Sequence, residues 1–209
     1  MTVKQALEFV GGLSEPSKMP CYGYGTPAKN CRTGRKLRKI KNSVCSICYA
    51  LKGHFSYPNV QASLQRKEDS ISKKEWEDAM VLAIGGWEGS GYFRWAVSGD
   101  LLNFQHLIKI VNIANRLPHI KFWLPTREFA LISKFIKIHG AFPENLTVRL
   151  SAIMIDGAPP TALAKKLGVG TSGVTKEGFS CPASKQNNFC LNCRACWERD
   201  VENINYKKH

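Results

Sequence analysis

Residues 92–124 read YFRWAVSGDLLNFQHLIKIVNIANRLPHIKFWL, and the pattern of side chains changes twice within this stretch. Residues 92–98 are rich in aromatic and β-branched side chains, which is typical of a buried strand. An apolar stripe at helical spacing follows, and Pro118 ends it before a second strand-like run at residues 120–124. A strand, a helix and a second strand in this order predict a β-α-β unit with parallel strands. The stripe consists of Leu101, Phe104, Leu107, Ile108, Val111, Ala114 and Leu117.

The alternation of extended and helical patterns continues upstream of this unit. Residues 59–87 place apolar side chains at helical spacing, and Ser72-x-x-Glu75 within them matches a capping box. Residues 36–44 precede this helical region and are expected to form a first strand. The upstream half therefore adds one strand and one helical region to the β-α-β unit.

A further helix and strand are expected downstream. Thr126 is placed to cap a helix that ends at Gly140, and residues 146–155 (LTVRLSAIMI) have the composition of a strand. Residues 168–178 are glycine-rich and are expected to form a loop. Four strands are too few for a closed eight-stranded barrel. We therefore predict an α/β protein with a partial parallel β/α barrel or a small open sheet, and with cysteine-rich terminal loops that bind metal clusters.

The chain has 209 residues, a length that suits one domain. We divide this domain into an N-terminal cysteine loop region (1–58), a β/α core (59–167) and a C-terminal cysteine-rich segment (168–209) packed on the core. Apolar runs fall short of the roughly 18 to 20 residues of a membrane span, and the N-terminus lacks the apolar region of a secretory signal. We expect a soluble protein of the cytoplasm.

The net charge of the chain is strongly positive. Thirty Lys and Arg residues against sixteen acidic residues give +14, which favours an anionic partner such as nucleic acid. Residues 29–41, the basic segment, contain no acidic residue. This segment could contact phosphates, protect a strand edge, or offset the negative charge of a thiolate-bound cluster. Its basic residues are Lys29, Arg32, Arg35, Lys36, Arg38, Lys39 and Lys41.

Eight cysteines fall into two groups at the ends of the chain. In a reducing compartment, cysteines grouped in this way are expected to bind metal rather than to form disulfides. Four cysteines in each group fit two separate tetrathiolate sites, and they also fit one or two centres built from both ends together. The groups are Cys21, Cys31, Cys45 and Cys48, and Cys181, Cys190, Cys193 and Cys196.

The spacing within the C-terminal group favours an iron–sulfur cluster over zinc. Cys190-x2-Cys193-x2-Cys196 lets one short loop reach three corners of a [4Fe–4S] cluster, and Cys181, followed by proline, can supply the fourth ligand. Zinc, which usually takes two facing C-x2-C knuckles, is the alternative. In the N-terminal group, Cys45-x2-Cys48 suits zinc and iron equally.

The first half of the chain resembles a radical S-adenosylmethionine enzyme. In those enzymes a cysteine loop follows the first strand, and a Gly-Gly-Glu-like motif at the end of the second strand binds the methionine amino group. Here Cys48-Tyr49-Ala50 ends the cysteine loop, and Ser98-Gly99-Asp100 occupies the position of that motif. The resemblance implies that these three residues contact a cofactor, S-adenosylmethionine. The C-x3-C-x2-C motif would need cysteine at position 41, which is Lys41, so Cys31, Cys21 or a C-terminal cysteine would supply the third ligand.

Over nearly its full length the chain resembles the bacteriophage gene product 88-like family. The matching motifs are Lys18-Met19-Pro20, Thr33-Gly34, CSICYALKG, FRWAVSGD and CLNCRACW. These motifs are specific, but they imply little about activity. They do imply a phage protein that acts in the cytoplasm of the host cell.

Three functions fit these residues. The first is an iron–sulfur protein with a redox or structural role, in which both cysteine groups pack at the carboxyl ends of the strands. The second is a radical S-adenosylmethionine-like enzyme, and the third is a nucleic-acid-binding protein stabilised by zinc or a cluster. Asp100 either contacts a ligand or caps the following helix. Cys21 lies in a Tyr/Gly-rich loop ten residues before Cys31, and we expect it to contribute least to a metal site.

Overall fold

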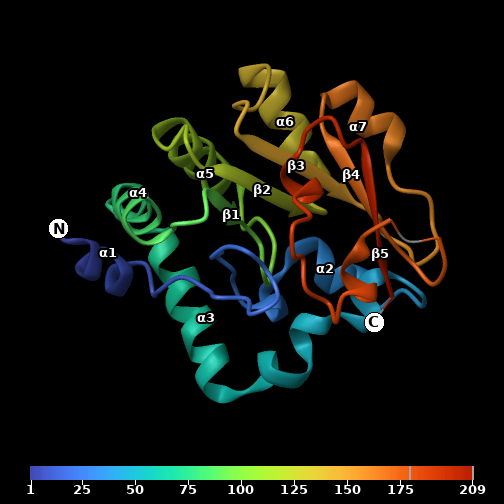
Figure 1. Cartoon of the computed structure of the whole chain (residues 1–209), viewed down its shortest axis with the longest axis horizontal. Coiled ribbons are helices and arrows are strands. Elements are labelled where there is room, and N and C mark those ends of the chain that lie inside the picture. The colour runs from blue at the N-terminus through green and yellow to red at the C-terminus, as the bar shows by residue number, and fades with distance from the viewer. Residues whose placement is uncertain (179, 209) are drawn as a thin grey trace.

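A five-stranded parallel sheet forms the centre of the protein, and it is curled into a half-barrel (Figure 1). The computed structural model describes residues 1–178 and 180–208. Each strand pairs with its neighbours in chain order, so every connection runs between adjacent strands. This confirms the predicted α/β class and the parallel sheet. The strands are β1 (Tyr92–Arg94), β2 (Lys121–Thr126), β3 (Leu146–Ser151), β4 (Gly170–Thr175) and β5 (Asn203–Lys207).

Helices cover the outer face of this sheet, and Figure 1 shows α5, α6 and α7 side by side along it. Apolar residues of these helices and of α1 and α4 pack with those of β1, β2 and β3 in one core. The α-helices are α1 (Val3–Phe9), α2 (Arg32–Leu37), α3 (Pro58–Ile71), α4 (Trp76–Trp87), α5 (Phe104–Arg116), α6 (Phe129–His139) and α7 (Thr161–Leu167). The short 3-10 helices are η1 (Ala28–Asn30), η2 (Val44–Ile47), η3 (Tyr49–Leu51), η4 (Gly53–Ser56), η5 (Pro182–Lys185) and η6 (Ala195–Trp197).

The β1–α5–β2 unit forms as its periodicity predicts. Asn103 accepts a hydrogen bond from the amide of His106 and so caps α5, and Leu107 and Ile110 on its apolar stripe are buried. Each such side chain contributes about 1.5–3 kcal/mol by leaving water. The helix therefore stays on the sheet because of its apolar stripe.

The expected strand at residues 36–44 is wrong, because this part of the chain forms α2 and a turn. Residues 22–26 instead lie along the free edge of β1. The amide of Tyr24 donates to the carbonyl of Arg94, and the amide of Val97 donates to the carbonyl of Tyr24. Gly25 permits this pairing, since a Cβ there would lie 2.7 Å from the amide nitrogen of Ser98. An extended segment thus precedes the cysteine loop, but it comes earlier in the chain than expected.

The predicted count of four strands is also wrong, because the chain forms five strands in the sheet. The glycine-rich stretch at 168–178 forms β4 rather than a loop, and β5 follows near the C-terminus. Gly170 leaves room in β4 for the side chain of Arg149, because a Cβ at position 170 would lie 2.6 Å from a guanidinium nitrogen of Arg149. The glycines that suggested a loop make room for side chains on the inner face of the half-barrel.

The structure corrects two of the predicted helix boundaries and confirms a third. The helical region 59–87 is two helices, since Ser72 ends α3 and Glu75 precedes α4 without a capping hydrogen bond from its side chain. Thr126 is not the N-cap of α6, a position that Glu128 takes. Gly140 does end α6, with φ of +83°, a conformation that favours glycine.

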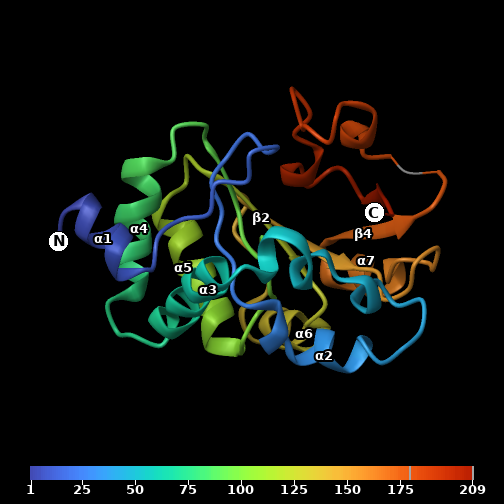
Figure 2. The same ribbon diagram turned by 90° about the horizontal axis from the view of Figure 1, so that it is seen from below.

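The C-terminal segment lies across the inner face of the half-barrel. The indole of Trp197 donates to the carbonyl of Phe93, and Lys121, the first residue of β2, forms an ion pair with Glu198 at 2.8 Å. Glu198 of this segment thus lies at the amino end of β2, whereas the sulfur of Cys196 lies 3.3 Å from the hydroxyl of Tyr206 near the carboxyl end of β5. The expectation that both cysteine groups pack at the carboxyl ends of the strands stays a prediction for the C-terminal segment. In Figure 2 this red segment and α2 lie on opposite sides of β4. Among the described residues, no helix is long and apolar enough to cross a membrane.

Candidate metal centres

Three N-terminal cysteines, Cys31, Cys45 and Cys48, form what we call the first thiol group. Cys31 is the residue before α2, Cys45 lies in η2, and Cys48 ends η2. Gly34 in α2 lies between two of them, since a Cβ at this position would be 3.7 Å from the sulfurs of both Cys31 and Cys45. The two sulfurs therefore both lie beside Gly34.

Main-chain hydrogen bonds fix this loop at the carboxyl end of β3. The amide of Val44 donates to the carbonyl of Ile153 at 2.8 Å, and the amide of Ile155 donates to the carbonyl of Asn42 at 2.9 Å. Ser43 lies between these bonds and is fully buried. Its hydroxyl donates to the carbonyl of Leu37 and so connects the loop to α2. The first thiol group thus lies where parallel sheets usually place their functional sites.

Asp100 connects the ends of β1 and β2 beside this group. Its carboxylate accepts hydrogen bonds from the Thr126 hydroxyl at 2.5 Å and from the amides of Leu101 and Arg127 at 2.8 and 2.9 Å. The expected alternative role as a helix cap is wrong, because Asn103 caps α5. Burial raises the pKa of the Asp100 carboxyl above its ordinary value.

Ser98 and Gly99, predicted with Asp100 to contact a cofactor, face the neighbouring segment. The Ser98 hydroxyl donates to the carbonyl of Thr26 at 2.8 Å. Gly99 has φ of +78°, and a Cβ there would lie 2.7 Å from the same carbonyl oxygen. These two residues therefore hold residues 22–26 against the end of β1, and a cofactor contact through them stays a prediction.

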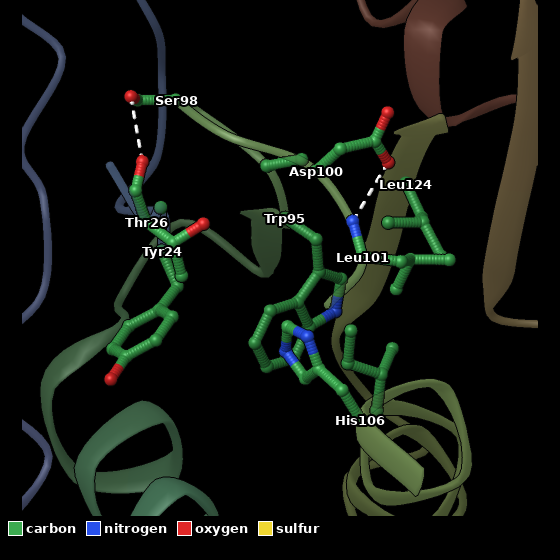
Figure 3. Close-up of a pocket in the computed structure, with 11 residues that line it drawn as sticks. Tyr24, Thr26, Trp95, Ser98, Asp100, Leu101, His106 and Leu124 are labelled. Carbon is green, nitrogen blue, oxygen red and sulfur yellow. Dashed lines mark hydrogen bonds between the residues drawn. The ribbon is translucent and has the colours of Figure 1, made fainter. Parts of the chain in front are cut away.

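A small cavity of about 10 Å³ lies beneath Asp100 (Figure 3). Its wall includes the indole nitrogen of Trp95 and Nε2 of His106, both buried and without a hydrogen-bond partner among the described residues. Nδ1 of His106 accepts a hydrogen bond from the amide of Leu102, so Nε2 carries the proton. Two N–H donors therefore face a space large enough for about one water molecule.

Two thiols of the first group, those of Cys31 and Cys45, are held in their protonated form. Burial, together with the nearby Asp100, Cys48 and Cys45, raises the pKa of Cys31 to about 12. Burial raises the pKa of Cys45 as well, while Arg127 opposes this effect. Because metals bind the thiolate, any metal that binds here must release these protons.

The second thiol group consists of the four C-terminal cysteines together with Cys21. Cys190 interacts electrostatically with Cys181 and Cys193, and Cys196 interacts with Cys181. Cys21 interacts with Cys190, whose amide donates to the carbonyl of Lys18. The sequence grouping of Cys21 with Cys31, Cys45 and Cys48 therefore does not match its position in space.

Tyr206 and Trp123 close the inner side of the second thiol group. The Tyr206 hydroxyl lies 3.3 Å from the sulfur of Cys196, and its ring packs against that of Trp123. Trp197 packs edge-on against Trp123 with ring centroids 5.4 Å apart. Burial raises the pKa of the Cys196 thiol to about 11. Such aromatic shielding tunes the potential of a metal site when one is bound.

The thiols are gathered, but they do not converge on single points. Among residues 1–178 and 180–208, no three His, Cys, Asp or Glu side chains are placed to hold one metal ion.

The basic segment is a largely exposed surface next to the first thiol group. Six of its seven basic residues are exposed, and only Arg38 is half-buried, where it donates to the carbonyl of Ala28. Its position on and after α2 removes the interpretation as a protected strand edge. The exposed residues are Lys29, Arg32, Arg35, Lys36, Lys39 and Lys41.

Two arginines that the sequence analysis did not single out are central to the inner face. Arg149 is fully buried in the middle of β3, and Arg94 ends β1. A charged residue within the apolar run LTVRLS was the available signal for Arg149. Arg94 lies in an aromatic run, where nothing local indicated its role.

Comparison with known proteins gives one match. A family model with the description Gene product 88 matches residues 3–199. No curated protein and no solved structure matches the chain. The bacteriophage family resemblance is therefore confirmed, and the radical S-adenosylmethionine resemblance finds no support in these comparisons.

Proposed function

This chain belongs to the Gene product 88 family, and we propose that it is an iron–sulfur protein whose two thiol groups each hold a [4Fe–4S] cluster with a redox or structural role. The observation that supports this most is the separation of the eight cysteines into two groups, each of which interacts within itself. Helix α2, beside the first group, and the C-terminal segment, which carries most of the second, lie on opposite sides of β4 (Figure 2). Thiolate ligands of this kind need a reducing compartment, which is consistent with the cytoplasm of a phage host.

Cluster binding in the second thiol group is favoured by its loop geometry. Cys190, Cys193 and Cys196 lie on one short loop, and Cys181 interacts with Cys190 and Cys196 from the other side. A [4Fe–4S] cluster takes three thiolates from one such loop and the fourth from a remote cysteine, so its binding here would require these four sulfurs to move together. When bound, such a cluster supplies one-electron redox chemistry or a rigid connection between the loop and the inner face of the sheet.

The metal content of the protein tests this proposal. Anaerobically purified or reconstituted protein is expected to be brown, to absorb broadly near about 400 nm and to contain iron and acid-labile sulfide in equal amounts. Colourless protein with stoichiometric zinc would contradict it. A variant with Cys190, Cys193 and Cys196 replaced by Ser serves as the matched control for the second group.

A radical S-adenosylmethionine-like enzyme is the second candidate, and the first thiol group favours it. With Cys21 in the other group, three thiols remain here, so a cubane would keep one iron without a protein ligand. The parallel half-barrel and the extended residues 22–26 before the loop agree with this candidate. The reduced protein would cleave S-adenosylmethionine to a deoxyadenosyl product, and the Cys48→Ser variant would not. Intact S-adenosylmethionine after reduction would rule the enzyme out and leave the iron–sulfur protein in place.

Nucleic-acid binding is the third candidate, supported by the exposed basic segment. Lysines and arginines that contact phosphates make affinity fall steeply with salt. A variant with Arg32, Arg35 and Lys36 replaced by Gln would then bind a DNA or RNA duplex more weakly and with a smaller salt dependence. Replacement of Lys4, Lys165 and Lys166, on other helices, is the matched control. Equal loss in both variants would mean that only the net charge matters.

A further inference from the structure

Arg94 lies on the inner face of the half-barrel, between the N-terminal cysteine loop and the second thiol group. Its guanidinium carbon lies 4.5 Å from the ring centroid of Trp123. Nη1 donates to the sulfur of Met19 at 3.2 Å, and Nη2 donates to the hydroxyl of Tyr49 at 3.4 Å. Nε is buried and has no hydrogen-bond partner among the described residues. The positive charge therefore contacts a thioether, a phenol and an aromatic ring.

Arg94 forms no ion pair with a carboxylate in the part of the chain that the structure describes. Glu88, which acts electrostatically on the neighbouring Cys21, accepts hydrogen bonds from the amides of Tyr22 and Ser90 and not from Arg94. A partly buried cation without a counter-charge is costly, and it is usually paired with an anion or a metal site. The groups that interact electrostatically with Arg94 are Cys21, Cys190, Cys196 and Tyr206.

The other two arginines near the second thiol group have their donors directed elsewhere. All three guanidinium nitrogens of Arg149 donate to main-chain carbonyls. Arg194 lies over the ring of Tyr92, and its Nη1 donates to the carbonyls of Leu191 and Cys193. Arg94 thus differs from both in combining a positive charge with a buried N–H that has no partner.

We propose that Arg94 is the counter-charge of the second thiol group, and that it raises the reduction potential of the cluster bound there. This inference rests on the proposed iron–sulfur function. A nearby positive charge stabilises the more negative, reduced cluster, and N–H donors directed at cluster sulfur act in the same direction. Arg38 and Arg127 are the arginines that interact with Cys31 and Cys45 of the first group. We therefore expect Arg94 to act more strongly on the second cluster than on the first.

Potentiometric titration of the cluster-loaded protein, followed by electron paramagnetic resonance, tests this assignment. Arg94→Gln removes the charge and Arg94→Lys keeps it. We expect Arg94→Gln to shift the reduction equilibrium of one of the two clusters at least tenfold toward the oxidised form, which is 59 mV for one electron. Arg94→Lys is expected to shift it by much less, and the other cluster is expected to keep its potential in both variants. Arg116→Gln, an exposed arginine paired with Asp78, is the matched control and should change neither potential.

The outcomes separate this inference from the proposed function. Wild-type protein without iron would refute the iron–sulfur proposal itself. Two clusters with unchanged potentials in Arg94→Gln would overturn only the role of Arg94. If Arg94→Gln loses iron instead of changing potential, retention of that iron in Arg94→Lys supports the counter-charge. Equal loss in both variants would show that the shape of the arginine, and not its charge, is required.

Discussion

Arg149 brings a positive charge into the middle of the sheet, where its side chain is fully buried. Its guanidinium donates to main-chain carbonyls in η6, in the residues that follow η6 and in β4, so the C-terminal segment folds around one side chain. The dipoles of these carbonyls stabilise the charge where water cannot. The accepting carbonyls belong to Cys196, Thr171, Val201, Ala195 and Glu198.

Replacement of Arg149 by Met is expected to release the C-terminal segment from the inner face. Removal of the donor leaves several buried carbonyls unpaired, which costs about 3 kcal/mol or more of the free energy of unfolding. Amide hydrogen exchange should become faster over residues 195–201 while α5 stays protected, and urea unfolding should shift to lower concentration. Arg199→Met, at an exposed position of the same segment, is the control and should change neither. Unchanged exchange in Arg149→Met would show that the aromatic contacts alone hold the segment.

His106 makes the stability of the core depend on pH. Burial, together with the charge of Lys109, lowers its pKa to about 3, so the folded protein keeps the ring neutral. Between the unfolded pKa of about 6.5 and the folded value, the unfolded chain binds a proton that the folded chain excludes, so stability falls as pH falls. From pH 7 to pH 5 this loss is about 2 kcal/mol in wild type, and His106→Gln should lack it. Urea unfolding at both pH values measures it, and exposed His119→Gln should behave as wild type. An equal pH dependence in His106→Gln would contradict this account.

At the scale of elements, α2 and η2 form the frame of the first thiol group. They contact each other directly, and Gly34 lies at the contact with Cys31 and Cys45. The pairing of residues 42–44 with the segment after β3 fixes this frame against the sheet. The geometry of the sulfurs is therefore set by close packing within a few residues of the cysteines.

Gly34→Ala is expected to disturb the first thiol group and leave the second intact. A Cβ there would lie 2.9 Å from Cβ of Cys31, closer than the two atoms can approach, so Cys31 must move. The protein should lose about half of its iron, the share of one cluster in two. Helix propensity acts in the opposite direction, since alanine favours a helix by about 1 kcal/mol over glycine. Full iron content in Gly34→Ala would show that the sulfurs tolerate the shift.

Gly89→Ala is the matched control for this variant, because a Cβ there meets no atom within 4 Å. Its iron content should equal that of wild type.

Local patterns predicted the elements that are stabilised by their own periodicity. The β1–α5–β2 unit and the end of α6 at Gly140 follow from apolar spacing, a stop at Pro118 and a glycine cap. Residues 22–26 and β4 were missed because their glycines allow the backbone to pack closely against residues that are distant in the sequence. Spacing along the chain does not reveal such contacts. The sequence left Asp100 open between a ligand contact and a helix cap, because its partners Thr126 and Arg127 lie at the end of the next strand and are distant along the chain.

At the scale of the whole molecule, the half-barrel places cysteines that are close in the sequence in different thiol groups. Cys21 lies ten residues before Cys31 in the chain, yet it belongs to the thiol group on the inner face. The first thiol group keeps three cysteines at the carboxyl end of the strands. The number of cysteines and their spacing were readable from the sequence, but their division into groups depends on the curl of the sheet.

The central claim, two separate clusters in two thiol groups, is tested most directly by iron and sulfide counts on wild type and two triple variants. Wild type is expected to hold about eight iron and eight sulfide per chain, as two [4Fe–4S] clusters require. Replacement of Cys31, Cys45 and Cys48 by Ser should leave about half of each, and so should replacement of Cys190, Cys193 and Cys196. Cys21→Ser should cost less iron than replacement of Cys31, Cys45 or Cys48 alone. Loss of all iron from either triple variant would contradict the account, because it would show that both ends of the chain share one centre.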